Sequence, residues 1–168
     1  QYITTGYIRI AVFYQDDPFG KDVLQSAEQL IKNAGGTLVA KGAYAKNTTD
    51  VAAAVKIIAA AKPQAVILIA NTAASAEFLK QSREAGSLAQ HVALSTTDAA
   101  QVVQRIGANK AEGLALTQVV PDPNSHTVAL IREIQNNFAK FKPRDVTLNH
   151  TFVEGYLGAM VLGEALRR

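Results

Sequence analysis

The sequence contains no cysteine and no tryptophan, and it has one methionine and three histidines among 168 residues. The absence of cysteine excludes disulfide bonds and thiolate metal sites, and it is compatible with both a cytoplasmic and a periplasmic location. No stretch of 18 apolar residues occurs, so no transmembrane helix is predicted, and no signal peptide is present in this chain. No pair of histidines or carboxylates has metal-ligand spacing. We therefore expect no metal and no cofactor.

Neither positive nor negative charge predominates in the sequence. The 17 basic and 14 acidic residues are spread along the chain and leave a net charge of only +3. Nucleic-acid binding needs clustered basic residues, and no basic run interleaved with aromatic residues occurs, so we expect no nucleic-acid partner. Hydrophobic residues make up 48% of the sequence, which is typical of a globular protein, and the length allows one domain with a real core.

The clearest local pattern is a strand, a loop and a helix near the start of the chain. Arg9 to Tyr14 is a short β-branched and aromatic run, which predicts a strand buried on both faces. Gln15 to Gly20 is the expected loop. From Lys21 the apolar residues recur with helical spacing until Gly35, where the helix is expected to end.

The same alternation continues for four more strands. Further strands are expected at residues 37–43, 65–70, 91–95 and 113–119, with helices between them. N-cap residues are expected at 48–50, 71–72 and 96–98. Alternating strands and helices with right-handed crossovers predict an α/β fold with a doubly wound parallel sheet in three αβα layers.

This alternation stops at residues 121–124, Pro-Asp-Pro-Asn, which have the composition of a hinge. Two helices are expected beyond it, at about 125–141 and 152–168, and the second is expected to begin with a capping box formed by Thr151 and Glu154. The second helix has a wide apolar surface, and no strand remains to cover it. We expect a lobe at 1–119, a crossover at 120–124, and a segment at 125–168 belonging to a partner lobe outside this chain. The alternative is that the helices fold back on the first sheet.

Polar side chains follow the first, third and fourth predicted strands. In the strand order 2-1-3-4-5 these loops share the carboxyl edge of the sheet, where α/β folds bind ligands. The side chains there offer an aromatic ring, an amide, hydroxyls and an acid, which together could hold a small polar molecule. The candidate ligand-binding residues are Phe19, Asn71, Thr72, Thr96, Thr97 and Asp98. The alternative for each polar residue taken singly is a helix cap.

Enzyme motifs are incomplete. Gly20-Lys21-Asp22 resembles a phosphate loop, but the motif requires Ser or Thr in place of Asp22 and a second glycine five residues before Gly20, where Gln15 stands. No histidine falls at the predicted edge, so a hydrolase would have no visible base. We therefore expect a binding module and not an enzyme.

A phosphoacceptor receiver domain is an alternative with the same fold. Asp16 and Asp17 match the acidic pair of such a domain, and Ser95 or Thr96 matches its hydroxyl residue. The acceptor aspartate is missing, because Asn71 follows the third strand. Without the acceptor no phosphoryl transfer is expected.

Three segments in order, RIAVFYQDDPFGKD, TTDVAAAVKIIAAAKPQAVIL and AEGLALTQVVPDP, resemble the second lobe of type I periplasmic binding proteins. The similar branch is that of the leucine/isoleucine/valine-binding receptors of ABC importers. The resemblance implies a periplasmic receptor that closes two lobes on an amino acid or related polar molecule, with the importer's membrane subunits as partners. It also implies that this chain is a fragment that lacks the first lobe.

The resemblance also implies residue roles. Phe19 would pack against the ligand side chain, and Asn71 or Thr72 would face the ligand. Asp98 would pair with a ligand ammonium group or would cap a helix. A cytoplasmic sugar-responsive repressor core has the same two-lobe fold and is the other functional alternative. Because the helix at residues 152–166 lacks a partner sheet, homo-oligomerisation or domain swapping through it is expected as well.

Overall fold

The computed structural model describes residues 5–168, and the chain divides into two compact units, Gln1–Thr117 and Gln118–Arg168. The first unit contains a five-stranded parallel sheet with strand order β2-β1-β3-β4-β5. Its strands are β1 (Arg9–Gln15), β2 (Thr37–Tyr44), β3 (Ala65–Ile69), β4 (Gln90–Ala93) and β5 (Ala115–Leu116). The predicted doubly wound topology and strand order are confirmed.

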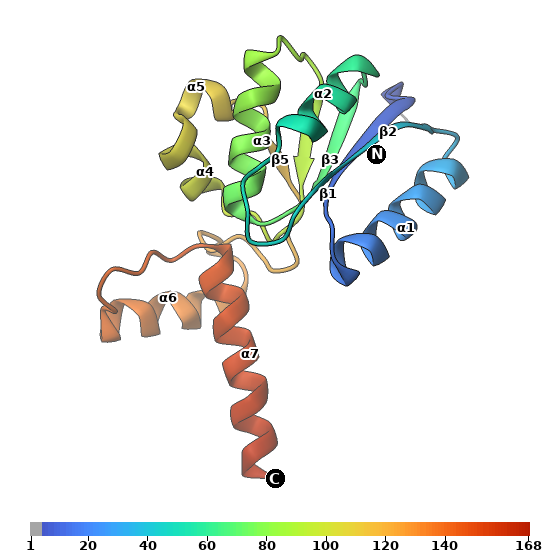
Figure 1. The fold of residues 1–168 in the computed structure, drawn as a ribbon. Helices are drawn as coiled ribbons and strands as arrows, with labels where there is room; N and C mark the ends of the chain where they lie inside the picture. Colours follow the sequence, from blue (N-terminus) through green and yellow to red (C-terminus); the bar gives the residue numbers. More distant parts are fainter. Residues whose placement is uncertain (1–4) are drawn as a thin grey trace. The chain divides into compact units, whose positions relative to one another are not determined.

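Helices cover both faces of this sheet (Figure 1). Helix α1 (Pro18–Asn33) lies on one face, and α2 (Ala52–Ala60) and α3 (Thr72–Glu84) lie on the other. Helices α4 (Ala99–Ile106) and α5 (Ala108–Ala111) pack against α3 through an apolar cluster that includes Leu79 and Val102. The three layers predicted from the sequence are therefore present.

Strand β1 is buried on both faces, as its composition predicts. Ala11 and Phe13 join the core beneath α2 and α3, whereas Ile10 and Val12 join the core beneath α1. This division follows from the two-residue period of a strand, which directs successive side chains to opposite faces. The Phe13 ring stacks on Phe78 with ring centroids 4.2 Å apart.

Three local predictions in the first unit are wrong. Helix α1 begins at Pro18 and not at Lys21, because Asp17 is its N-cap and proline is well suited to the first helical turn. The residues at 48–50 do not cap α2; its N-cap is Val51, which makes no side-chain cap hydrogen bond. Strand β5 is only two residues long, because its ladder is limited to pairs with Val92 and Ala93.

His91 on β4 is fully buried in the sheet. Its Nε2 lies 3.1 Å from the Ser82 hydroxyl, and its Nδ1 has no hydrogen-bond partner within the described residues. Burial, aided by the nearby positive charge of Arg83, lowers the pKa of His91 to about 4. The imidazole is therefore neutral in the folded protein at neutral pH.

The second unit consists of α6 (Ala129–Phe141) and α7 (His150–Arg167). Their contact is an apolar cluster centred on Ile131, Ile134 and Val153, all fully buried. Helix α6 begins four residues later than predicted. The predicted capping box of Thr151 and Glu154 is wrong, because Asn149 is the N-cap of α7 and its side chain accepts a hydrogen bond from the amide of Phe152.

Only the first half of α7 is covered by apolar neighbours. The large apolar side chains of its second half are exposed: Met160 by 41%, Val161 by 72%, Leu162 by 60% and Leu166 by 79%. A row of exposed apolar side chains on one helix is a candidate contact surface.

We expect copies of this chain to associate through the second half of α7, because association removes that apolar surface from water. Sedimentation should show an average mass that rises with concentration. The double substitution Val161→Glu and Leu166→Glu should give a monomer, whereas Leu88→Glu, at a side chain that is 95% exposed in the first unit, should leave association unchanged. A concentration-independent monomer of the unmodified chain would contradict this expectation.

Acid should destabilise the first unit through His91. Its pKa is about 4 when folded and near 6.5 when unfolded, so the unfolded chain binds more protons between these values, and stability falls as pH is lowered through this window. The loss should total about 3 kcal/mol. Urea unfolding across this pH range should show that His91→Gln removes much of the slope, while the exposed His126→Gln retains it. An unchanged slope in His91→Gln would refute the assignment.

Candidate functional site

One hydroxyl group joins the ends of β1 and β2 to the loop after β3. The Tyr44 hydroxyl donates to Gln15 Oε1 at 2.9 Å and accepts from the Asn71 amide at 3.3 Å. The Tyr44 ring is buried and stacks on Phe13 with centroids 5.0 Å apart, so the hydroxyl has a fixed position. Burial raises the pKa of Tyr44, which keeps this donor protonated at neutral pH.

Asp17 organises the loop after β1. Its Oδ1 accepts from the Gly20 amide at 2.9 Å, and its Oδ2 accepts from Gln15 Nε2 at 2.6 Å and lies 3.4 Å from Lys46 Nζ. The hydrogen bond from the Gly20 amide is the main reason why the pKa of Asp17 is lowered. This carboxylate is therefore a structural acceptor, and the turn that it holds leaves the Phe19 ring 45% exposed.

The loops after β3 and β4 are joined by threonine hydroxyls. Thr72 Oγ1 accepts from the Asp98 amide at 3.0 Å, and Thr96 Oγ1 donates to the Ala70 carbonyl at 3.0 Å. Thr97 is 1% exposed, and its hydroxyl lies 2.9 Å from that of Ser75. Thr97 therefore supports the loop from within, and it offers a ligand almost no surface in this structure.

Two predicted site residues also cap helices. The Asn71 side chain accepts from the Ala74 amide at the start of α3, and the Asp98 side chain accepts from the Gln101 amide at the start of α4, each at 3.0 Å. The capping alternative is therefore confirmed for both residues. Capping accounts for one oxygen of each side chain.

An open depression of about 750 Å³ lies at this edge of the sheet. It is lined by residues 47–49 after β2, residues 71–73 after β3, Thr96 after β4, and Arg105 in the last turn of α4. Of the six predicted residues, Asn71, Thr72 and Thr96 line the depression. Phe19, Thr97 and Asp98 do not line it.

Sequence reasoning missed two parts of this lining. Residues 47–49 follow a parallel strand, and this position assigns them to the carboxyl edge of the sheet. On sequence alone, residues 48–50 are predicted to cap a helix instead. Arg105 follows Asp98 by seven residues, which places both on one face of a helix with 3.6 residues per turn. That spacing could have identified Arg105 once Asp98 was a candidate.

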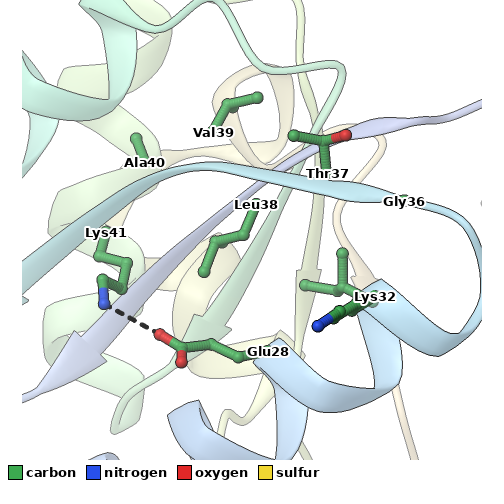
Figure 2. Close-up of a pocket in the computed structure, with 9 residues that line it drawn as sticks. Glu28, Lys32, Gly36, Thr37, Leu38, Val39, Ala40 and Lys41 are labelled. Carbon is green, nitrogen blue, oxygen red and sulfur yellow. Dashed lines mark hydrogen bonds and ion pairs between the residues drawn. The ribbon is translucent and has the colours of Figure 1, made fainter.

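A second groove, of about 540 Å³, lies between α1 and the edge strand β2 (Figure 2). An ion pair between Lys41 and Glu28, 3.0 Å long, crosses it. None of the six predicted residues lines this groove. A charged side chain such as Lys41 on an edge strand is a common protection against pairing with another chain.

Within residues 5–168, no three His, Asp or Glu side chains are grouped so that they could hold a metal ion. In the same part of the chain, no helix combines the length and apolar character needed to cross a membrane.

The fold and the polar carboxyl edge define a ligand-binding lobe of the type I α/β class. The sequence profile of the family described as "Periplasmic binding protein" matches residues 1–168, and the chain belongs to that family. The resemblance inferred from the three sequence segments is confirmed.

Solved structures with this fold match nearly the whole chain. A substrate-binding periplasmic protein from Ralstonia solanacearum is 35% identical, with a TM-score of 0.90 over 99% of this chain and 47% of its own. An extracellular ligand-binding receptor from Verminephrobacter eiseniae ef01-2 is 28% identical, with a TM-score of 0.80 over 99% of this chain and 47% of its own. A possible leucine/isoleucine/valine-binding protein from Rhodopirellula baltica SH 1 is 25% identical, with a TM-score of 0.84 over 98% of this chain and 46% of its own.

A curated relative, Leu/Ile/Val-binding protein homolog 7 of Brucella abortus (strain 2308), is 32% identical over 79 residues. That stretch is 47% of this chain and 20% of the relative. The chain spans about half the length of the solved proteins that it matches.

The turn that presents Phe19 should not tolerate a side chain at position 20. A Cβ added to Gly20 would lie 1.9 Å from the Gln15 carbonyl oxygen, a backbone atom that cannot rotate away. Gly20→Ala should therefore lower the free energy of unfolding by about 2 kcal/mol or more. Ser26→Ala, at an exposed position of the same helix, is the matched control and should change it by less than about 0.5 kcal/mol. Equal stability of the two variants would mean that the turn is not constrained as described.

Proposed function

We propose that this chain is part of a solute-binding receptor of an ABC importer, which captures a small polar ligand, an amino acid, between two lobes. The observation that carries this proposal is the shared depression at the carboxyl edge, where Asn71, Thr72 and Thr96 come together from two loops. Membership of the periplasmic binding protein family supports it, and so do the names of two relatives, a Leu/Ile/Val-binding protein homolog and a possible leucine/isoleucine/valine-binding protein.

The same proposal assigns each part of the chain to one of the two lobes of the receptor. The sheet-containing segment 1–119 supplies one wall of the ligand site, 120–124 is a crossover, and 125–168 belongs to the partner lobe. The missing first lobe supplies the other wall and encloses the ligand when the lobes close. The whole receptor then acts in the periplasm and delivers its ligand to the membrane subunits of the importer.

Three side chains have proposed roles in contact with an amino acid. The exposed Phe19 ring packs against the ligand side chain, and Asn71 or Thr72 contributes a polar contact. Asp98 pairs with the ligand ammonium group while also capping α4. Such a pair is a charge-assisted hydrogen bond, which is stronger than a neutral one.

The receiver-domain alternative receives no support from the described contacts. Asn71 stands where the acceptor aspartate would be required, and its side chain caps α3. Asp16 is paired with Lys21 at 2.8 Å, and Asp17 is held by the Gly20 amide. The repressor-core alternative shares the two-lobe fold, and a DNA-binding segment upstream in the parent gene would favour it.

Substitutions in the complete two-lobed receptor test the proposed contacts by calorimetry with a panel of amino acids. Asp98→Asn should weaken amino-acid binding by about 2 kcal/mol or more, because it removes the partner of a desolvated ammonium group. Phe19→Ala should cost a similar amount through lost packing. Glu112→Gln, at an exposed residue that precedes β5 and so lies toward the opposite edge of the sheet, is the matched control and should have no effect.

If Asp98→Asn binds amino acids as tightly as the unmodified receptor, Asp98 is a helix cap only. If the unmodified receptor binds no amino acid, the proposed ligand class is wrong.

A further inference from the structure

The depression at the carboxyl edge has an unbalanced charge. No carboxylate lines it, and Arg105 is its one charged lining residue among the described residues. The ion pairs among the described residues all join other lysines or arginines to acids, and Arg105 takes part in none of them. Its side chain is exposed and makes no hydrogen bond within residues 5–168. The guanidinium group is therefore available to an anion.

Hydrogen-bond donors line the same depression as Arg105. The residues at 48–50 do not cap α2, so the Thr49 hydroxyl is not used by the backbone and has no partner in the described chain. Asn47 also lines the depression, and its backbone has a positive φ of 63°. The neighbouring Thr48 hydroxyl is already used, because it donates a hydrogen bond to the Ala45 carbonyl. The Asn71 amide oxygen faces the Ala74 amide, which leaves the amide nitrogen as the group available for a ligand.

The start of α3 adds to this polarity. Residues 71–73 are the N-terminus of a helix of 13 residues, which carries a partial positive charge. With the guanidinium group and the side-chain donors, it makes the lining electropositive and rich in N–H and O–H groups. That combination matches a carboxylate, which accepts hydrogen bonds and carries one negative charge.

We propose that this depression binds a carboxylate of the ligand through Arg105, and that the ligand is an acidic amino acid. The proposal rests on the proposed receptor function and narrows its ligand class. Asp98 lies seven residues before Arg105, so one face of α4 carries an anion near its start and a cation near its end, about 10 Å apart along the helix. Opposite charges at the two ends of this face match the ammonium group and the side-chain carboxylate of an acidic amino acid.

Binding to the complete two-lobed receptor tests this inference with glutamate, aspartate, glutamine, leucine and succinate as probes. Glutamate should bind about tenfold or more tightly than glutamine, which has the same shape without the charge. Arg105→Gln should weaken glutamate binding by about tenfold or more and leave glutamine binding unchanged. Lys56→Gln, which removes an exposed positive charge from α2, is the matched control and should leave both unchanged.

The outcomes separate the two proposals. Glutamine or leucine binding as tightly as glutamate, or no effect of Arg105→Gln on glutamate, would overturn the carboxylate site and leave the receptor function standing. Tight binding of succinate that Arg105→Gln weakens would support the carboxylate site and overturn the acidic amino acid as ligand. Failure of every amino acid and of succinate to bind would overturn the proposed function and the inference with it.

Discussion

The arrangement of the candidate site depends on the hydroxyl group of Tyr44. It connects Gln15, the last residue of β1, with the amide of Asn71 after β3, and Tyr44 is itself the last residue of β2. The ring is stacked on Phe13, which is itself stacked on Phe78 of α3 in the same core cluster. The packing of the core therefore fixes the ends of β1 and β2 relative to the loop after β3. The geometry of the candidate site depends on that packing.

Threonine hydroxyls attach the loop after β4 to the loop after β3, and the residues that cap helices here are also proposed ligand contacts. Asn71 and Asp98 each use one side-chain oxygen to cap a helix, and Thr72 accepts the amide of Asp98. A side chain held in this way has little conformational entropy left to lose when a ligand binds. Capping and ligand contact are thus compatible roles of the same residue.

The sequence predicted the sheet well, because β1 and β3 are apolar runs whose burial on both faces has a strong compositional signal. It predicted the start of α1 poorly, since Asp17 and Pro18 can belong either to a loop or to a helix start. Arg105, which lines the depression, was also missed. Its spacing of seven residues from Asp98 was the sequence signal for it, and the folded loops place it beside residues 47–49 and 71–73.

The proposal that this carboxyl edge is one wall of the ligand site is tested most directly by a crystal structure of the complete two-lobed receptor with its ligand bound. We expect the ligand to lie in van der Waals contact with Asn71, Thr72 or Thr96, with the second lobe closed over it. A ligand that contacts only the other lobe, or that lies in the groove between α1 and β2, would contradict it.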